Sequence, residues 1–498
     1  MKLPRHQFKK AWEIRADFLA KKTTSERVTG EYLERLSRDD TNSYITVTSD
    51  DALSAARTAD KEFAQGKVAS RIAGIPIGLK DILLTKGVRT TCGSKVLENY
   101  ISPYDGTVVA KLKAARSVSL GKLNMDEFAM GSSGEDSAYG KTLLPFARDR
   151  VPGGSSSGSA AAVAGNLAVM TIGTDTGGSV RQPASFSGVV GLKPTYGRVS
   201  RYGVIAFASS LDQVGPVALD AQDTADFLDA IAGYDEWDAT SSSRPADASG
   251  LAVEKIRQDK SARAGFLKKL RVGVPQEFFA KGLNSGVQEK VEGAIESLRR
   301  AGAEIVPVTL PHSKYSLSVY YVVAVSEASA NLARFDGVRF GTRKMPDAER
   351  TTLEEMYETT RGELFGKEVK RRILLGTFTL SAGYYDAYYR KACQVRNLIS
   401  QDFSAAFAKC DLIIGPTTPT VSFPLGGGGK KEDPLTMYLN DIYTVPVNLA
   451  GLPAVSLPWG FSEGLPVGVQ LIGPAFSETN LLCATAALEI LHDEGGIA

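Results

Sequence analysis

A serine closes a glycine-rich run whose backbone suits a developing negative charge. The run reads GTDTGGS over residues 173–179, and its last residue is Ser179. Glycines let a substrate carbonyl approach the chain closely. The backbone amides of Thr176, Gly177 and Gly178 can converge on an oxyanion. We therefore expect Ser179 to be a nucleophile that attacks a carbonyl carbon beside an oxyanion hole.

A second cluster of serine and glycine precedes this run. It reads PGGSSSGS over residues 152–159 and leads into an apolar segment, residues 160–172. A Gly/Ser run is usually a flexible linker. Here both clusters flank a segment that must be buried, so their backbone polar groups need partners. A phosphate-binding loop is the other alternative, but neither the Walker spacing nor GxGxxG after a strand is present.

The chain offers few histidines to act as the base. Of its three, His6 and His492 lie near the chain ends, and His312 follows a proline in a connecting segment. A Ser-His-Asp triad needs a histidine inside the site. The sequence therefore requires a different base.

Lys80 is a candidate for that base. It lies near the end of the run GIPIGLKD, residues 74–81, in which every residue before it is apolar or glycine. Burial in an apolar pocket lowers the pKa of a lysine and makes it a plausible general base. Asp81 follows directly, but successive side chains of a strand point to opposite faces, so Asp81 need not restore the charge of Lys80.

These residues need an α/β core to hold them. Residues 72–218 combine short apolar strands with helical stretches and little charge. That texture is typical of an α/β unit with buried strands. We expect an N-terminal helical segment, residues 1–70, packed on one large domain over residues 71–498.

Further elements follow from local patterns of apolar residues. We expect helices within residues 8–70 and a buried helix over residues 160–172, and we interpret residues 236–265 as a surface excursion. The remaining expected elements are strands at 270–274 and 410–416, a helix at 286–301, and a mostly helical part at 325–410.

Composition restricts the function classes. The 498 residues carry a net charge of +2, which gives no electrostatic reason for this chain alone to hold nucleic acid. Four cysteines without a CxxC pair predict no metal site, no disulfide framework and a reducing compartment. No apolar segment follows the basic N-terminus, and residues 160–172 are too short to span a bilayer. We expect a cytoplasmic protein with no membrane partner, while an organelle stays open.

The motifs and their spacing resemble the amidase signature family. The family-level matches are residues 74–81, 153–159 and 173–183. Within the family the chain is similar to the A subunits of glutamyl-tRNA(Gln)/aspartyl-tRNA(Asn) amidotransferases. That similarity is carried by residues 121–132, 191–200, 207–216, 371–377, 383–389 and 434–442. The resemblance implies one large α/β/α sandwich around a mixed, mostly parallel central sheet.

The resemblance also implies a Lys-Ser-Ser mechanism. Ser179 attacks a carboxamide carbon, and Ser155, held after a cis peptide bond, bridges Ser179 and Lys80. Neutral Lys80 takes the proton and later delivers it to the leaving ammonia. Asp175 and Arg181 are expected to hold the nucleophile loop rather than to contact substrate.

Glutamine is the substrate that the resemblance implies. Its α-carboxylate needs a cation and its α-amino group an anion, and these map to Arg372 and Asp441. Tyr321 and Ser132 are expected to line the pocket. The alternatives are a helix ion pair for Arg372 and a helix or turn cap for Asp441.

Partners follow from the same resemblance. Ammonia would pass to B and C subunits of a heterotrimer that amidates mischarged Glu-tRNA(Gln), Asp-tRNA(Asn) or both. ATP and magnesium would belong to the partner, with no cofactor in this chain. One alternative is a stand-alone amidase, which would share Lys80, Ser155 and Ser179 without needing an amino-acid clamp. Another is a scaffold that lost its chemistry, against which the intact triad speaks.

Three residues depart from the family pattern. Ser157 stands at a usual glycine, so its turn must have a conformation that a non-glycine residue tolerates. Gly134 and Asp136 replace the usual Thr or Asn and Asn. None of the three belongs to the predicted triad. We therefore expect them to alter the detailed shape of the pocket and not the catalytic residues.

Overall fold

A sheet of 11 strands organises the chain in the computed structural model, which describes residues 2–280, 282–346, 350–429 and 438–495. The strands are β1 (Tyr44–Val47), β2 (Pro76–Lys80), β3 (Val118–Leu123), β4 (Met170–Asp175), β5 (Val190–Lys193), β6 (Gln213–Ala218), β7 (Arg271–Pro275), β8 (Glu304–Val308), β9 (Leu412–Pro416), β10 (Ala454–Ser462) and β11 (Leu465–Ile472). Their order across the sheet is β1-β3-β2-β4-β6-β5-β10-β11-β9-β7-β8.

The sheet is mixed, as the resemblance implies. β2 pairs in parallel with β3 and β4, and β7 pairs in parallel with β8 and β9. Among the described strands, however, antiparallel pairs outnumber parallel ones. One reason is that β10 and β11 form a hairpin, and another is that β6 runs against both β4 and β5. The α/β sandwich is confirmed, but its parallel share is smaller than expected.

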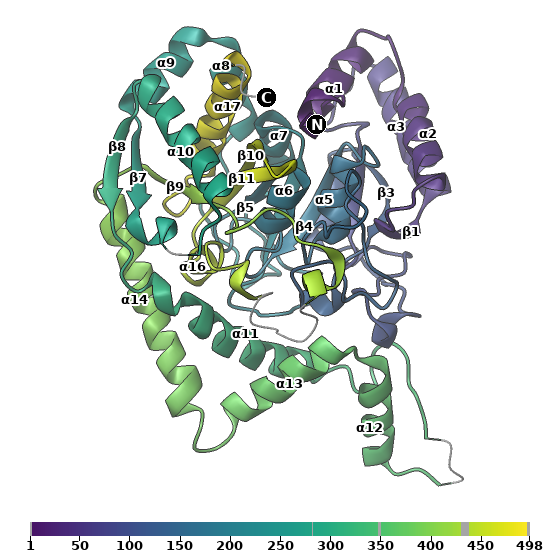
Figure 1. Cartoon of the computed structure of the whole chain (residues 1–498). Helices are drawn as coiled ribbons and strands as arrows, with labels where there is room; N and C mark the ends of the chain where they lie inside the picture. Colours follow the sequence, from purple (N-terminus) through teal and green to yellow (C-terminus); the bar gives the residue numbers. More distant parts are fainter. Residues whose placement is uncertain (1, 281, 347–349, 430–437, 496–498) are drawn as a thin grey trace.

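Helices cover both faces of this sheet (Figure 1). The described α-helices are α1 (Ala11–Leu19), α2 (Ser25–Ser37), α3 (Ser49–Ala64), α4 (Thr107–Ala114), α5 (Ser157–Ala164), α6 (Arg181–Ser187), α7 (Ala221–Ile231), α8 (Ser249–Gln258), α9 (Lys260–Lys269), α10 (Ser285–Arg300), α11 (Ser316–Leu332), α12 (Leu353–Leu364), α13 (Lys367–Leu380), α14 (Lys391–Phe407), α16 (Val445–Leu449) and α17 (Glu478–Glu494). None of the described helices is long and apolar enough to cross a membrane.

The alternation of side chains along β6 separates two cores. Val217 packs in a small cluster with residues of α5 and α6. Val214 and Ala218 belong to the large cluster that also contains Ala225 of α7. Because neighbouring strand residues point to opposite faces, α5 and α6 cover one face of β6 and α7 the other. The predicted catalytic segments lie beside the smaller, fully buried cluster.

The N-terminal segment is not helical throughout. Helices α1, α2 and α3 are present as expected, but Tyr44–Val47 forms β1 and pairs with β3 at the edge of the sheet. Alternation is hard to recognise in a strand of four residues that lies between helices. The segment is thus joined to the sheet by β1 and does not only pack on it.

Two other expectations about local structure are wrong. The apolar run 160–172 is not one helix, because α5 ends at Ala164 and Asn166 adopts a φ of 57° before β4 begins. Residues 236–265 include α8 and most of α9, and buried Val253 and Ile256 anchor the first of these. A uniformly apolar run shows neither helical nor strand periodicity. In a mostly polar segment, the few buried side chains that anchor a helix are hard to recognise from the sequence.

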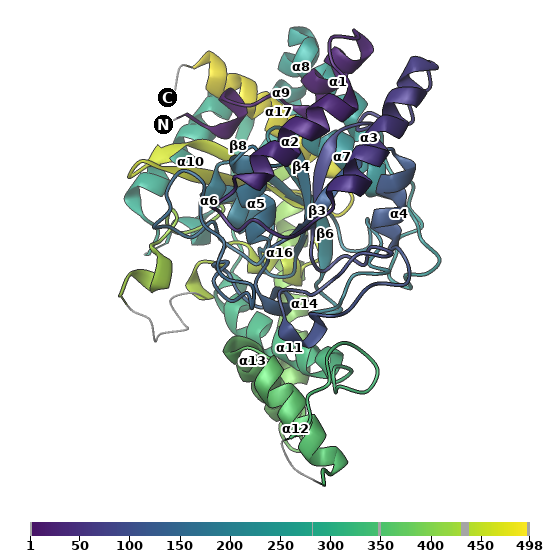
Figure 2. The ribbon, with the colours of Figure 1, turned by 90° about the vertical axis from the view of Figure 1, so that its right-hand side faces the viewer.

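Helices α11 to α14 confirm the expected helical part and extend away from the sheet. Figures 1 and 2 show α12 and α13 at the end opposite to the N-terminal helices, with α11 between α13 and the rest of the molecule. Residues 434–437 of the motif at 434–442 lie outside the described residues.

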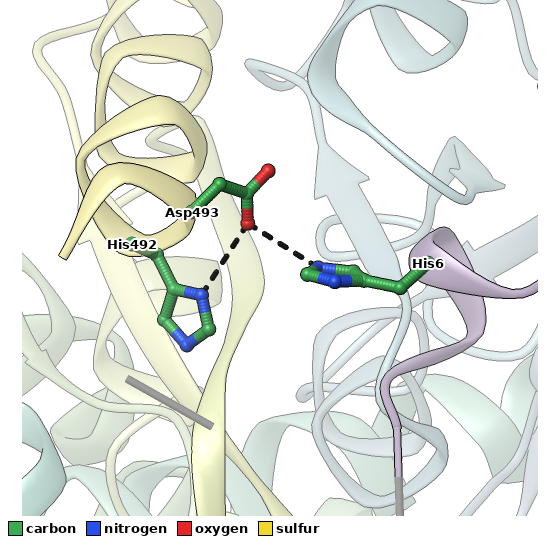
Figure 3. A group of neighbouring side chains, drawn as sticks. All are labelled: His6, His492 and Asp493. Atoms are coloured by element: carbon green, nitrogen blue, oxygen red, sulfur yellow. Dashed lines mark ion pairs between the residues drawn. The ribbon is translucent and has the colours of Figure 1, made fainter. Parts of the chain in front are cut away.

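The two ends of the chain are held together. Arg5 donates hydrogen bonds to His6 Nε2 (2.9 Å) and to Asp493 (2.9 Å), and its Nη2 lies 3.0 Å from His492 Nδ1. Figure 3 shows the two imidazole rings on either side of the Asp493 carboxylate. His6 and His492 therefore join the ends of the chain.

Candidate active site

Lys80 ends the buried strand β2, and its side chain is fully buried. Its Nζ makes hydrogen bonds to the hydroxyl oxygens of Ser155 (2.8 Å), Ser156 (2.9 Å) and Thr174 (2.9 Å). Burial lowers the pKa of Lys80 to about 7, although nearby carboxylates oppose the shift. A lysine with this pKa is neutral often enough at neutral pH to accept a proton.

Asp81 turns away from Lys80, as strand alternation predicts. Its carboxylate lies 3.1 Å from Lys122 Nζ and accepts a hydrogen bond from Thr91 N at 2.8 Å. Both members of this ion pair are almost completely buried. The charges of Asp81 and Lys122 therefore offset each other. The hydrogen-bond partners of Lys80 are hydroxyl groups.

Ser155 reaches Lys80 from the turn before α5. The peptide bond between Gly154 and Ser155 is cis, as the resemblance implies. The next residue, Ser156, ties this turn to β4, because its Oγ donates to Thr174 O (3.1 Å) and accepts from Thr174 N (3.2 Å). Sequence reasoning missed Ser156 and Thr174 as partners of Lys80, since nothing in a serine-rich run marks the hydroxyl that points inward.

Ser179 lies beside this turn on the loop after β4. Ser156 N donates to the Ser179 carbonyl at 3.2 Å. Ser179 is 9% exposed, whereas Ser155 and Lys80 are 0% exposed, so the predicted nucleophile is the one nearest to solvent. Among the described residues, the Ser179 hydroxyl has no hydrogen-bond partner, and the implied bond to Ser155 is not formed.

The backbone around Ser179 offers free donors. Within the described part of the chain, the amides of Gly177, Gly178 and Ser179 have no acceptor. The Thr176 hydroxyl donates to the buried Asp212 carboxylate at 2.6 Å, which anchors the start of the loop. Unpaired N–H groups next to a serine hydroxyl are what an oxyanion hole requires.

An ion pair holds this loop in place, as expected for Asp175 and Arg181. The guanidinium donates to both carboxylate oxygens of Asp175 at 3.0 Å. Its remaining contacts include the Thr444 carbonyl (3.2 Å) and the side chain of Gln470 (2.6 Å). Arg181 stays with the protein and is not free to bind substrate.

The two loop glycines are required by close neighbours. A Cβ at Gly177 would lie 2.6 Å from the Tyr320 ring, and one at Gly178 would lie 2.3 Å from Thr444 Oγ1. Gly178 also has a φ of +145°, which side-chain-bearing residues rarely adopt. Tyr320 was not predicted at the site, because only the fold brings α11 against the loop.

Arg372 lies on α13 among aromatic rings. Its guanidinium carbon is 5.6 to 5.8 Å from the ring centroids of Tyr321, Phe207 and Tyr438. The alternative ion pair exists, since Nε donates to Glu368 at 2.8 Å. Among the described residues, however, the two terminal nitrogens have no partner. A guanidinium with two free nitrogens can hold a carboxylate, and Tyr321 lies beside it as expected.

Asp441 and Ser132 form a buried pair. Ser132 Oγ donates to the Asp441 carboxylate at 2.9 Å. Burial raises the pKa of Asp441 to about 7, although the Ser132 hydrogen bond opposes this. The Asp441 side chain does not cap a helix or turn. The amides of Thr444 and Val445 donate to the backbone carbonyl of Asp441 and not to its carboxylate. A Cβ at Gly178 would lie 3.3 Å from the carboxylate, so Asp441 borders the nucleophile loop.

Glu127 connects the helix of Arg372 to the core, and sequence reasoning missed it. Its carboxylate accepts hydrogen bonds from Gly366 N (2.8 Å) and from the Ser94 hydroxyl (2.5 Å). Gly366 is the N-cap of α13, where a negative charge is favourable. Burial raises the pKa of Glu127 to about 7. This contact joins residues 239 apart in sequence, so no local pattern could reveal it.

The departures from the family pattern lie together. Ser157 begins α5 without a positive φ, so its turn tolerates a side chain as expected, and its hydroxyl lies 3.0 Å from that of Thr142. A Cβ at Gly134 would lie 2.5 Å from the Ser157 Cβ. The missing side chain at Gly134 therefore leaves the room that Ser157 fills. Asp136 follows nearby, and burial raises its pKa to about 7.

Among the described residues, one group has side chains that could ligate a metal: His6, His492 and Asp493. The guanidinium of Arg5 already lies within hydrogen-bond distance of all three. A second cation at the same place would be repelled by that charge. We therefore assign no metal to this cluster. Its side chains hold the two ends of the chain together (Figure 3).

Comparison with known proteins identifies the family. The amidase family model matches residues 27–482. The chain belongs to the amidase family. Two curated relatives are each named as the A subunit of glutamyl-tRNA(Gln) amidotransferase. The relative from Nitrosococcus oceani is 53% identical over 472 residues, covering 94% of each chain. The relative from Geobacter metallireducens is 55% identical over 451 residues, covering 90% of this chain and 89% of its own.

Solved structures of this amidase family share the fold. The A subunit of glutamyl-tRNA(Gln) amidotransferase from Thermotoga maritima has a TM-score of 0.74 at 43% identity, covering 92% of this chain and 90% of its own. The peptide amidase from Stenotrophomonas maltophilia has a TM-score of 0.79 at 32% identity, covering 97% and 96%. The α/β architecture and the family predicted from the motifs are confirmed.

Proposed function

We propose that this amidase is the glutamine-hydrolysing subunit of a tRNA-dependent amidotransferase. Support comes from relatives at 53% and 55% identity along about nine-tenths of the chain, both named for that subunit. The substrate is inferred from two buried charges near the Ser179 loop. Among the described residues, Arg372 has two terminal nitrogens without a partner, and Asp441 borders the loop at Gly178. These two charges match the α-carboxylate and α-amino groups of glutamine.

The chemistry proceeds through an ester on Ser179. Ser179 Oγ attacks the carboxamide carbon of glutamine while its proton passes through the Ser155 hydroxyl to neutral Lys80. The carbonyl oxygen becomes an oxyanion, which the free amides of residues 177–179 and that of Thr176 stabilise. The C–N bond then breaks, and Lys80 returns the proton through Ser155 so that ammonia leaves.

Water completes the cycle. It attacks the ester carbon and gives a proton to Lys80 by the same route, and a second oxyanion forms in the same hole. The C–O bond to Ser179 breaks, Ser179 recovers its proton, and glutamate leaves. Each step uses one base that both accepts and returns a proton, which suits a pKa near neutrality.

The ammonia is passed to partner subunits in the proposed complex. B and C subunits would complete a cytoplasmic heterotrimer. ATP and magnesium would act at the partner on mischarged Glu-tRNA(Gln), Asp-tRNA(Asn) or both. To test this, the chain is mixed with candidate B and C subunits, ATP, magnesium and glutamine, and amidation of Glu-tRNA(Gln) and Asp-tRNA(Asn) is measured separately. If neither tRNA is amidated, the proposal is refuted. The ratio of the two amidation rates shows which tRNA is the preferred acceptor.

A stand-alone amidase is the second candidate, favoured by the structural likeness to a peptide amidase. It would use the same triad without an amino-acid clamp. Replacing Arg372 by Ala separates the two. Glutamine turnover should collapse if the clamp is used, whereas hydrolysis of an amide without an α-carboxylate should survive with either function. Unchanged glutamine turnover would favour the second candidate.

A further inference from the structure

Helix α13 packs one face against α11, and its opposite face exposes apolar side chains. On the inner face, a Cβ at Gly376 would lie 2.0 Å from the Val325 carbonyl of α11, so the two helices touch closely. The hydroxyls of Thr379 and Ser326 reinforce this contact at 2.7 Å. On the outer face, Leu374 is 71% exposed and Phe378 45% exposed.

The turn after α13 enlarges this outer face. The Phe378 ring lies 4.4 Å from that of Tyr384 and 5.9 Å from that of Tyr388. Leu374 and Leu375 precede Phe378 by four and three residues, so they share its side of the helix. We call the exposed residues Leu374, Leu375, Phe378, Tyr384 and Tyr388 the α13 patch.

Contiguous exposed apolar side chains usually mark a surface for another macromolecule. No other described part of the chain covers the patch, because its five residues stay 42 to 71% exposed. Helix α13 lies beside α12 in the helical extension that points away from the sheet (Figures 1 and 2). A separate partner must cover it.

The charges around the patch indicate a protein partner. Arg371 is paired with Glu368 at 2.6 Å, and Arg390 is paired with Asp386 at 3.4 Å. Binding of nucleic acid or of an anionic lipid surface relies on lysine and arginine side chains that are free to meet phosphates. Here the two nearby arginines already have carboxylate partners.

Of the lysines next to patch residues, Lys370 donates to the Gly362 carbonyl at 2.7 Å, and Lys391 has no ion pair among the described residues. One free lysine is too few for a surface that binds phosphates. The patch therefore presents rings and methyl groups to an apolar protein face.

The position of α13 indicates which protein. The same helix carries Arg372 and Glu368, which border the proposed glutamine pocket. Leu375 lies about one helical turn from Arg372, so a protein seated on the patch adjoins the site that releases ammonia. Ammonia that diffuses into bulk water is lost, so its acceptor gains from docking at this place.

We propose that the α13 patch is the docking surface for the ammonia-accepting subunit; this rests on the proposed function. The test is the double variant Leu375→Glu/Phe378→Glu. The matched control is Leu19→Glu/Leu251→Glu, because these two leucines are similarly exposed on α1 and α8. Binding of each chain to the B and C subunits is measured by sedimentation, and acylation of Ser179 by glutamine is measured by mass spectrometry.

We expect the patch variant to bind at least about 100-fold more weakly, because charges replace the apolar anchors of an interface. The control should bind within about twofold of the wild type, and all three chains should acylate. Equal binding of the patch variant would overturn the proposal. Loss of tRNA binding with retained subunit binding, or loss of self-association alone, would also overturn it.

A second measurement guards against misfolding of the variant. Hydrogen exchange of the wild-type chain is compared with and without the B and C subunits. Protection that includes the segment 371–390 is expected, and its absence in a formed complex would overturn the proposal. If the wild-type chain transfers ammonia while both tests fail, only the docking surface is wrong. If it forms no complex at all, the proposed function itself fails.

Discussion

The burial of Lys80 makes a quantitative prediction about pH. With a pKa of about 7, half of the Lys80 side chains are neutral at pH 7 and about one in eleven at pH 6. Only the neutral form can accept the Ser179 proton. At saturating glutamine, kcat should therefore fall about tenfold from its plateau near pH 8 to pH 6.

The pH dependence of kcat/KM should be steeper, because it reports the free enzyme. There Asp441, whose pKa is raised to about 7 by burial, must also be ionised to receive the α-ammonium group. Bound glutamine keeps Asp441 ionised, so protonation of Asp441 does not contribute to the pH dependence of kcat. Well below pH 7, kcat/KM should fall about 100-fold per pH unit and kcat about tenfold.

Steady-state glutamine hydrolysis by the complex between pH 5.5 and 9 tests both slopes. Lys80→Arg is the informative variant, because arginine stays protonated across this range and should leave no turnover. Asp441→Asn should remove one of the two titrations from kcat/KM. A kcat that stays flat down to pH 5.5 would show that a neutral Lys80 is not the base.

The same group makes a linked prediction about stability. The folded pKa of Lys80 is below its unfolded value, so the unfolded chain binds more protons between about pH 7 and 10.5. The free energy of unfolding should rise with pH in this window. Relative to Lys80→Met, the wild type should gain about 2 kcal/mol between pH 7 and pH 9 in urea unfolding. An equal pH dependence in both proteins would contradict the inferred pKa.

Three further predictions concern the groups around the triad. Arg372→Gln should raise KM for glutamine about 100-fold while leaving hydrolysis of a simple ester within about threefold, and an equal loss on both substrates would refute a clamp. Glu127→Ala leaves the Gly366 amide and the Ser94 hydroxyl without their partner. It should weaken glutamine binding by about 2 kcal/mol, measured mainly as a higher KM, and Glu127→Gln should restore most of the binding. Gly178→Ala meets Thr444 at a φ of +145° and should lower kcat about 100-fold or more with KM little changed, whereas wild-type kcat would exclude a role for this loop geometry.

Much of the candidate site could be proposed from the sequence because its residues lie in short local motifs. Lys80 ends an apolar strand, and Ser155 and Ser179 lie in short glycine-rich runs, so residue type and spacing carry the signal. The structure brings Lys80 and Ser155 together at 2.8 Å. Sequence also separated Asp81 from Lys80 correctly, because strand alternation is a simple geometric rule.

The rest depends on contacts between distant segments. Tyr320 meets Gly177 only because α11 crosses the loop, and Glu127 meets Gly366 only because α13 begins there. Local propensity failed for a different reason at residues 160–172. The run is apolar throughout, so it fits a buried helix and a buried strand equally well, and the turn at Asn166 decides between them.

The triad and the substrate contacts come from different parts of the chain. The proposed acid–base groups lie within residues 80–181, on strands and turns of the sheet. The side chains proposed to select glutamine come largely from the helical extension, through Arg372, and from the segment around Asp441. Bond cleavage and substrate choice can therefore change independently. Exchanging the extension between amidases is a direct route to new specificity, because the proton pathway through Lys80 is left intact.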